Sequence, residues 1–402
     1  MLPVEIRPSI FWVGINDRRT ALFEGLWPIK EEGVSYNSYL IKDEKNVIID
    51  LTGKMSTDEL VEQVETIVKI ADLDYIVVNH MEPDHSGALK TILMLAPRAI
   101  ILGSAKTREM LDSFYGITER IQVVKDGEEI VLGKHTLRFI NTPWVHWPET
   151  MMTYETSQKI LFSCDGFGGY GALAGTIYDD ATELQSWYEE QALRYFTNIV
   201  ASYCRSINAA LTKLEKLPIL IVAPSHGLVW KNHPERIVEL YSRWAGYATG
   251  PGDAGITLLY ASMYGNTERL MEAVAQGVTD EGVPVSIFNL PGIHISKILP
   301  SLWLKQGVLV GGPTYEGGLF PEIKSALETA HLKHVPGRTT AIFGSHAWLG
   351  GAQREFELMM ADFKWEYTGN LEFFGSPSAD ELAQARVFGA EFARKVKAAA
   401  RK

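Results

Sequence analysis

Cysteine is scarce in this chain. Its 402 residues include only two cysteines, Cys164 and Cys204. Two thiols are too few for a disulfide framework, for the Cys₄ iron site of a rubredoxin or for a cubane iron–sulfur cluster within this chain. A low cysteine content is typical of proteins that work in a reducing compartment, so we expect a cytoplasmic protein.

Long apolar runs and blocks of basic residues are also absent from the sequence. A membrane-spanning helix needs about 18 or more apolar residues in a row, and the candidate around Ile92 is interrupted by Pro97 and Arg98. Residues 1–8 lack the apolar core of a signal peptide. The net charge is -11 and no Lys/Arg-rich block occurs, which makes nucleic acid a poor candidate partner. We therefore expect neither a membrane nor nucleic acid among the partners.

The length of the chain is comfortable for two domains. The glycine-rich segment 247–255 separates two regions whose apolar residues follow different patterns. We therefore predict one domain over residues 1–250 and a second over residues 251–402.

The first region mixes predicted strands and helices. Residues 56–71 show an amphipathic helical pattern, and residues 184–214 are predicted to be largely helical. Short apolar runs predict strands at 35–41, 47–50, 75–79, 100–102, 122–124, 136–140, 151–154, 160–163 and 219–223. We expect the helices to flank two sheets.

The second region alternates strands and helices regularly. Apolar runs predict strands at 256–261, 285–289, 308–311, 340–343 and 371–374, and predicted helices begin at Thr267, Pro321, Gln353 and Asp380. This α/β alternation is typical of a doubly wound, five-stranded parallel sheet, whose ligands bind at the carboxyl ends of the strands.

A cluster of metal-binding side chains follows the predicted strand 75–79. His80, Glu82, Asp84 and His85 fall within six positions. They offer two nitrogen donors, two hard oxygen donors and no thiolate, a mixture that suits iron, manganese or zinc.

Three further candidate ligands, His146, Asp165 and His226, stand at strand ends or in adjacent loops. Alone, such residues are usually structural, and an aspartate before glycine usually forms a turn, but seven together indicate a metal site. Four histidines and three carboxylates are too many ligands for one ion and fit two ions, with Asp165 as the simplest bridge. Cys164 adjoins Asp165, but strand alternation is expected to point it to the opposite face, into the core.

The order H-x-E-x-D-H, followed by a distant His, Asp and His, resembles the metallo-β-lactamase-like domain of flavodiiron proteins, which is an αββα sandwich. Zinc hydrolases of that superfamily carry H-x-H-x-D-H, whereas here Glu82 replaces the second histidine and favours iron. The resemblance implies two iron ions joined by a bridging oxide or hydroxide. In this diiron centre His80, Glu82 and His146 would hold one iron, Asp84, His85 and His226 would hold the other, and Asp165 would be shared.

Two positions near the implied irons vary within that family. In some members the residue that matches His85 is swung away, so water is the alternative to His85 as a ligand. Many members carry Phe-His-Gly near the irons, and this chain has Phe23-Glu24-Gly25 instead. A residue near the substrate pocket therefore differs.

Three loops of the second region resemble those that bind FMN in flavodoxins. The turn after strand 256–261 is rich in hydroxyl and amide groups, which predicts a phosphate cradle, with an ordinary helix cap as the alternative. The other two loops combine glycines, which allow close approach to a flat ring, with aromatic side chains that can stack on it. The implied FMN-binding residues are Ser262, Met263, Tyr264, Gly265, Asn266, Thr267, Pro313, Thr314, Tyr315, Ser345, His346, Ala347 and Trp348.

The resemblance implies reduction of dioxygen to water, of nitric oxide to nitrous oxide, or of both, with electrons relayed by FMN. It also implies an external electron donor, either a rubredoxin or a reduced deazaflavin coenzyme, and a head-to-tail homodimer or a dimer of dimers. Tyr195 is a candidate donor near the irons, with plain helix packing as the alternative.

Two other functions remain compatible with the sequence. The first is a dizinc or dimanganese hydrolase with a fused flavodoxin domain, because ligand types do not fix the metal. The second is an electron carrier that uses FMN alone.

Overall fold

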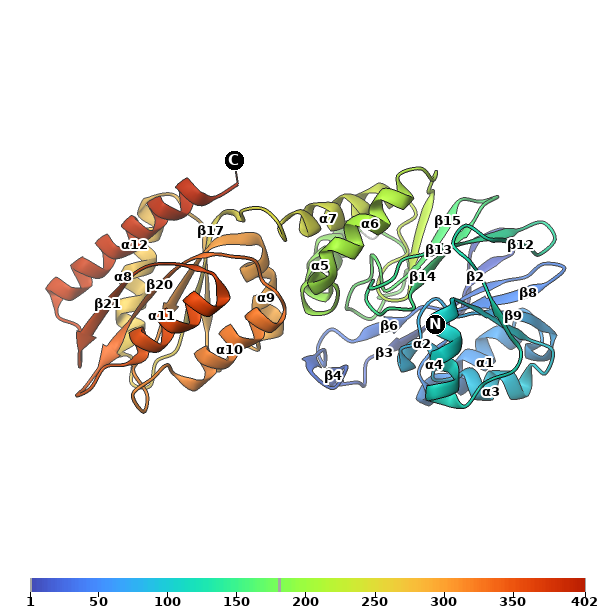
Figure 1. Cartoon of the computed structure of the whole chain (residues 1–402), viewed down its shortest axis with the longest axis horizontal. Helices are drawn as coiled ribbons and strands as arrows, with labels where there is room; N and C mark the ends of the chain where they lie inside the picture. Colours follow the sequence, from blue (N-terminus) through green and yellow to red (C-terminus); the bar gives the residue numbers. More distant parts are fainter. Residues whose placement is uncertain (1, 180–181, 402) are drawn as a thin grey trace. The chain divides into compact units, whose positions relative to one another are not determined.

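A computed structural model describes residues 2–179 and 182–401 of the chain. The chain divides into two compact units, Met1–Ala245 and Gly246–Lys402, and Figure 1 shows the elements of each. None of the helices in the described ranges has both the length and the apolar character that a bilayer crossing requires.

The first unit is built on two main sheets. One sheet has the order β1 (Val4–Arg7), β2 (Ile10–Trp12), β7 (Tyr39–Ile41), β8 (Asn46–Ile49), β9 (Leu73–Val77), β10 (Ile100–Gly103) and β11 (Ile121–Val123). The other has the order β12 (Glu129–Val131), β13 (Thr136–Asn141), β14 (Met151–Glu155), β15 (Ile160–Cys164) and β16 (Ile221–Pro224). Strands β8 to β11 are parallel, as are β15 and β16, so several of their carboxyl ends meet at common sheet edges.

Short strands and helices complete this unit. The short strands are β3 (Ile15–Asp17), which pairs with β6 (Val34–Tyr36), and β4 (Leu22–Phe23), which pairs with β5 (Trp27–Pro28). The helices are α1 (Thr57–Glu65), α2 (Pro83–Ser86), α3 (Leu89–Leu95), α4 (Ala105–Tyr115), α5 (Thr182–Tyr195), a π-helical turn (Phe196–Val200), α6 (Cys204–Leu214) and α7 (Pro234–Gly246). Apolar residues of α1, α3 and α4 pack with strands β7 to β10 in one buried cluster, because each helix presents an apolar stripe to the sheet.

Helix α1 is shorter than the sequence pattern predicted. It ends at Glu65, and the N–H groups of Ile67 and Val68 both donate to the carbonyl of Val64, each at 2.9 Å. The residues that follow Glu65 include the β-branched Thr66, Ile67 and Val68, which lose rotamer freedom in a helix. The apolar periodicity continues beyond the point where the helix ends.

The second unit is a parallel sheet with helices. Its strand order is β18 (Val285–Asn289), β17 (Asp253–Tyr260), β19 (Lys305–Gly311), β20 (Thr339–His346) and β21 (Glu366–Phe374), and every neighbouring pair is parallel. Its helices are α8 (Asn266–Asp280), α9 (Ile295–Leu304), α10 (Pro321–Leu332), α11 (Ala352–Phe363) and α12 (Ala379–Ala399). This arrangement confirms the predicted doubly wound, five-stranded sheet.

Helices α8 and α12 lie unusually close to each other in the second unit. A Cβ atom at Gly277 would lie 1.8 Å from the carbonyl oxygen of Arg386, and one at Gly389 would lie 2.1 Å from that of Val274. Glycine is therefore required at both crossings. Both helices contribute buried residues to the cluster on one face of the sheet.

Candidate metal centre and flavin site

The seven predicted metal ligands come together in the first unit. His80 and Glu82 lie in the loop after β9, and Asp84 and His85 lie in α2, which starts at Pro83. Proline suits the first position of a helix, where its missing N–H has no partner to lose. The loop between β13 and β14 carries His146, while Asp165 and His226 follow β15 and β16. All seven residues therefore lie near the ends of strands, as predicted.

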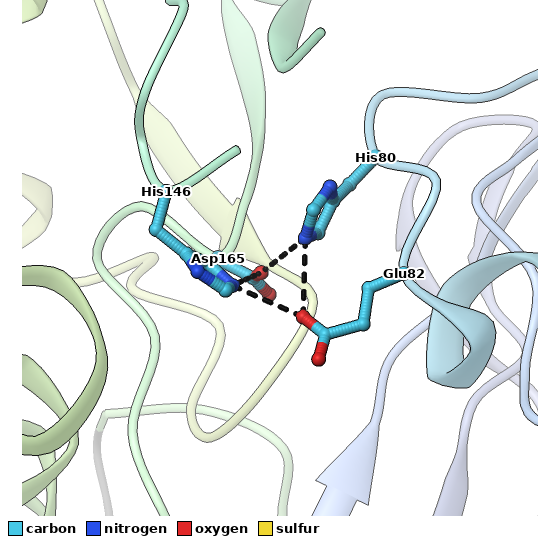
Figure 2. Close-up of side chains that lie close together, drawn as sticks. All are labelled: His80, Glu82, His146 and Asp165. Carbon is cyan, nitrogen blue, oxygen red and sulfur yellow. Dashed lines mark hydrogen bonds and ion pairs between the residues drawn. The ribbon is translucent and has the colours of Figure 1, made fainter. Parts of the chain in front are cut away.

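Four of the seven form a first ligand group, composed of His80, Glu82, His146 and Asp165. Glu82 Oε2 lies 3.2 Å from His80 Nε2 and 3.1 Å from His146 Nε2. Asp165 Oδ2 lies 3.3 Å from His80 Nε2 and 3.1 Å from His146 Nε2. Figure 2 shows the four side chains converging on the space between them.

The other three form a second ligand group, composed of Asp84, His85 and His226. Asp84 Oδ2 lies 3.4 Å from Nε2 of both histidines. The other oxygen of Asp165, Oδ1, lies 2.9 Å from His85 Nε2 and 3.3 Å from His226 Nε2. Asp165 therefore faces the first group with one oxygen and the second group with the other.

These distances fit metal ligands better than they fit hydrogen bonds. Each Nε2 atom carries at most one proton but lies near two carboxylate oxygens, so one N–H cannot serve both. Both oxygens of Asp84 and Asp165, and Nε2 of His85 and His226, are buried atoms that lack a hydrogen-bond partner among the described residues. Ligand atoms about 2.0–2.2 Å from one metal ion lie about 2.9–3.5 Å from one another, the range observed here. Both groups could therefore hold a metal ion.

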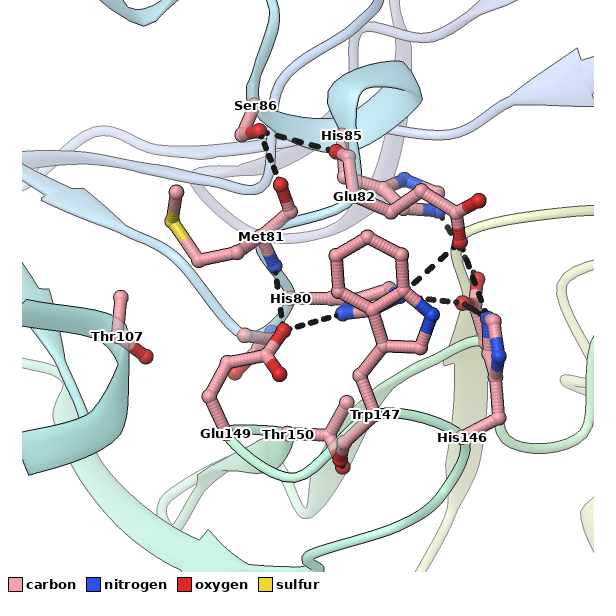
Figure 3. Close-up of polar contacts among 12 residues, drawn as sticks. His80, Met81, Glu82, His85, Ser86, Thr107, His146, Trp147, Glu149 and Thr150 are labelled. Atoms are coloured by element: carbon pink, nitrogen blue, oxygen red, sulfur yellow. Dashed lines mark hydrogen bonds and ion pairs between the residues drawn. The ribbon is translucent and has the colours of Figure 1, made fainter. Parts of the chain in front are cut away.

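Two of the histidines are oriented by partners on the far side of their rings. Glu149 Oε1 lies 2.6 Å from His80 Nδ1 and also accepts the Met81 N–H at 2.8 Å, as Figure 3 shows. His226 Nδ1 donates to the carbonyl of Ser35 at 2.8 Å. Such contacts fix which ring nitrogen is free to bind metal.

The sequence analysis did not find Glu149. The only feature of the local sequence that could have pointed to Glu149 is its place three residues after His146, in the same loop. His85 differs from His80 and His226, since its Nδ1 atom is buried without a hydrogen-bond partner among the described residues.

Burial disfavours a charged imidazole, but the neighbouring carboxylates outweigh burial at this centre. Asp165 and Glu82 raise the pKa of His146 to about 9. Asp165 and Asp84 raise the pKa of His226 to about 10. In the metal-free chain at neutral pH these imidazoles are therefore protonated and paired with carboxylates.

Metal binding is expected to release protons. The protonated, paired imidazoles stabilise the metal-free fold, and their contribution is complete below the pKa of an unfolded histidine, about 6.5. This contribution is lost as the pH rises through about 9 for His146 and about 10 for His226. A metal ion must displace these protons, so its affinity increases with pH and acid releases it. Calorimetry of metal binding near pH 7, in buffers of different ionisation enthalpy, should show that each ion releases at least about one proton. Binding without proton release would contradict these raised pKa values.

Cys164 was predicted to point away from the site, but its sulfur lies beside two of the candidate ligands. Its backbone φ is 51°, so the strand alternation fails at this last residue of β15. The sulfur and the ligand atoms of His85 and Asp165 lie within 4.8 Å of one another. Burial, together with the charges of Asp50 and Asp165, raises the pKa of the Cys164 thiol well above its usual range. In the metal-free chain the thiol therefore stays protonated.

A cavity of about 260 Å³ adjoins the two ligand groups. Its lining includes Glu82 and Asp84 together with Phe23, Glu24 and Tyr36. Glu24 therefore lies in the wall of a cavity beside the candidate metal site. It is the residue at which this sequence has Phe-Glu-Gly in place of the Phe-His-Gly that many members of the resembled family carry.

The ring of Tyr195 is centred 5.5 Å from that of His226, and its hydroxyl is buried without a hydrogen-bond partner among the described residues. Burial, with the charges of Asp165, Glu82 and Asp84, raises its pKa well above the usual range. The hydroxyl therefore stays protonated beside the centre. Its role as a donor to substrate stays a prediction.

A second cavity, of about 470 Å³, lies in the second unit. Of the residues predicted to bind FMN, the lining contains Met263, Tyr264, Asn266, Pro313, Thr314, Ser345, His346, Ala347 and Trp348. It also contains Glu316, Gly317, Leu349 and Gly375, which are not among the predicted FMN-binding residues. The other four predicted residues are not part of this lining: Ser262, Gly265 and Tyr315, in the same loops, and Thr267, in the first turn of α8.

The turn before α8 leaves the helix N-terminus open. Gly265 is the N-cap residue, with φ 86°, and it provides no side-chain cap. The Ser262 hydroxyl instead accepts the N–H of Gly265 at 3.0 Å. Free N–H groups at a helix N-terminus bind phosphate, so this turn fits the predicted phosphate cradle.

Trp348→Ala is expected to weaken FMN binding about fivefold, because an aromatic stacking contact contributes roughly 1 kcal/mol. Trp348 lines the second cavity and is 84% exposed. Fluorescence titration of the flavin-free chain measures the affinity, and the metal content should stay unchanged. Leu358→Ala, which alters an exposed apolar side chain of α11, is the control. Equal flavin affinity of the native chain and Trp348→Ala would reject the stacking role.

Comparisons with known proteins agree with this architecture. Residues 34–227 match the family described as ODP family beta lactamase, and residues 258–389 match the flavodoxin family. The anaerobic nitric oxide reductase flavorubredoxin of Shigella flexneri is 34% identical over 399 residues, which are 98% of this chain and 82% of that protein.

Two solved structures are also similar. The flavodiiron protein from Giardia intestinalis has a TM-score of 0.94 and 26% identity, covering 99% of this chain and 97% of the other. The rubredoxin oxygen:oxidoreductase from Desulfovibrio gigas has a TM-score of 0.92 and 25% identity, covering 98% of this chain and 99% of the other.

The fold and the two sites define a class of protein in which a metallo-β-lactamase-like domain is joined to a flavodoxin-like domain. Because its similarity to such proteins covers nearly the whole sequence, the chain belongs to the flavodiiron protein family. The family and the fold class predicted from the sequence are thereby confirmed.

Proposed function

We propose that this chain is an oxidoreductase that reduces dioxygen to water, nitric oxide to nitrous oxide, or both. The observation that carries the proposal is the division of seven buried ligands into two groups that share Asp165. In this proposal residues 1–250 form the diiron domain and residues 251–402 form the FMN domain. The relatives support it, because one is named a nitric oxide reductase and another an oxygen oxidoreductase.

The residues at the metal centre have distinct tasks in this proposal. His80, Glu82 and His146 would hold one iron ion, Asp84, His85 and His226 would hold the other, and Asp165 would be shared between them. When bound, the iron pair supplies electrons and open coordination positions for a small diatomic gas, and FMN supplies electrons to the iron pair. Glu149 and the Ser35 carbonyl orient two of the imidazoles, so that Nε2 faces the metal.

Part of the wall beside the centre is aromatic. Phe23 and Tyr36 line the adjoining cavity, and each ring packs edge-on against the His226 ring, at 5.4 Å and 5.5 Å. Apolar faces of this kind favour an uncharged gas over ions. The protonated Tyr195 hydroxyl can hold a proton near the site.

The partners of the enzyme follow from the same proposal. An external donor, a rubredoxin or a reduced deazaflavin coenzyme, supplies the electrons. A head-to-tail homodimer or a dimer of dimers brings the FMN of one subunit near the irons of another. Both cysteines are free, which fits the reducing cytoplasm that we propose as its location.

A hydrolase with zinc or manganese is the alternative that the sequence left open. It is less well supported, because Glu82 supplies an oxygen ligand that favours iron and the named relatives are oxidoreductases. An electron carrier that uses only FMN is also less well supported. It would not account for the buried ligand atoms of the first unit that lack hydrogen-bond partners among the described residues.

The decisive experiment starts from anaerobically purified protein whose iron, zinc, manganese and flavin contents have been measured. The reduced protein is mixed with dioxygen or with nitric oxide, and gas consumption is followed with electrodes. We expect two iron ions and one FMN per chain and rapid catalytic consumption of at least one gas. Zinc without iron, or a reduced protein that consumes neither gas, would reject the proposal.

A further inference from the structure

The second cavity contains one basic side chain. Among the described residues that line it, His346 is the only base and Glu316 is the only acid, and all other lining side chains are neutral. Oxidised flavin has a neutral ring, whereas the fully reduced ring tends to lose a proton and become negative. The single imidazole is therefore the lining group that can favour the reduced ring electrostatically.

His346 is held at the end of β20 but has unused hydrogen-bonding capacity. The Gly375 N–H donates to its carbonyl at 2.9 Å. The ring of Phe374 meets the imidazole edge-on, with centroids 5.8 Å apart and planes at 82°. Its Nδ1 atom is buried and has no partner among the described residues. An unpaired buried nitrogen is costly, so a ligand group that pairs with it improves the site.

Charged groups from other elements face the same region. Glu316 lines the cavity after β19. The carboxylate of Glu372 on β21 lies near Gly350, where a Cβ atom would be 3.8 Å from Oε1. Arg269 of α8 donates to Ser376 Oγ at 3.1 Å, next to Gly375. These three residues are charged groups that neighbouring elements bring to the region of His346.

We propose that His346 makes the reduction of FMN proton-coupled, by carrying a proton beside the reduced, negative flavin ring. The electrons come from the external donor and the proton comes from solvent, and no covalent bond forms or breaks at the imidazole. The inference rests on the FMN binding that forms part of the proposed function, and it adds a role for one residue.

The test is a spectroelectrochemical titration of the FMN-loaded, full-length chain with dithionite, at about pH 6 and about pH 8. His346→Leu removes both the imidazole proton site and the hydrogen-bonding capacity, and His346→Gln keeps a neutral donor and acceptor but no proton site. His331→Gln, on α10 and stacked on Phe363 at 4.1 Å, is the matched control because it removes a histidine outside the cavity lining.

At about pH 6, His346→Leu should bind reduced flavin about tenfold less tightly relative to oxidised flavin, which lowers the two-electron midpoint potential by about 30 mV. The difference from the native chain should shrink at about pH 8. His346→Gln should show the same loss of pH dependence with a smaller offset, and it replaces His346→Leu if that variant does not fold. His331→Gln should match the native chain.

Several outcomes would overturn the inference. Equal weakening of oxidised and reduced FMN would show that His346 only packs or binds phosphate. A potential difference that is the same at both pH values would exclude the proton. A native chain that binds no FMN would reject this inference together with the FMN part of the proposed function. A normal His346 effect in a protein that consumes neither gas would reject the proposed function alone.

Discussion

Asp165→Asn is expected to empty the metal centre of both ions while the chain still binds FMN. One oxygen of Asp165 faces His80 and His146, and the other faces His85 and His226. Asparagine offers one neutral oxygen and an NH₂ group that only donates hydrogen bonds. It therefore cannot bridge two cations.

The expected effect of this change is large. Removing one partner of a buried charge costs about 3–5 kcal/mol, which corresponds to a roughly 150- to 5,000-fold loss of metal affinity. Metal content, flavin absorbance and gas consumption are measured on one sample, with circular dichroism to verify folding. Asp126→Asn, which alters an exposed carboxylate paired with Lys213, is the matched control and should keep both ions. Two ions bound with native affinity in Asp165→Asn would contradict the bridging role.

The convergence of the seven candidate ligands was predictable because each follows a local rule. Polar residues directly after buried strands lie at the edge of a sheet, and the carboxyl ends of parallel strands meet at the same edge. His80, Asp165 and His226 follow β9, β15 and β16 in this way. The sequence thus reveals the candidate site through short-range patterns, repeated at several strand ends.

The contacts that orient the ligands could not be predicted in the same way. Glu149 meets His80 across 69 positions of sequence, and the Ser35 carbonyl meets His226 across 191 positions. Such pairs depend on how two sheets pack, and no local spacing encodes them. Cys164 shows the same limit, because a single positive φ at the end of β15 breaks the alternation from which its orientation was predicted.

Helix α9 was missing from the sequence analysis for a related reason. Pro300 lies inside it, and proline in a helix interior costs about 3 kcal/mol. Tertiary contacts offset this cost, since Leu299 and Trp303 are buried. The buried Arg338 guanidinium also donates to the carbonyls of Leu302 and Trp303, at 3.0 Å and 2.5 Å, in the last turn. The packing that stabilises this helix comes from residues distant in sequence.

His146→Asn provides a second test of the two-group arrangement. His146 contacts the carboxylates of Glu82 and Asp165 but belongs only to the first ligand group. The second group keeps all three of its members, and Asp165 Oδ1 still faces its two histidines. We therefore expect about one ion to remain per chain, gas reduction to be abolished and the flavin content to be unchanged. His331→Asn, in the second unit, is the control for loss of a histidine and should keep two ions.

The metal contents of Asp165→Asn and His146→Asn, measured together, test the two-group arrangement more sharply than either variant alone. Because Asp165 faces both groups and His146 faces one, Asp165→Asn should lose two ions where His146→Asn loses one. Loss of both ions in His146→Asn would mean that the groups bind metal as one unit. Retention of both would remove His146 from the ligand set, and loss of FMN in either variant would show that the flavin depends on the metal site. A stepwise loss, measured by metal analysis of samples prepared side by side, requires two sites with one shared carboxylate.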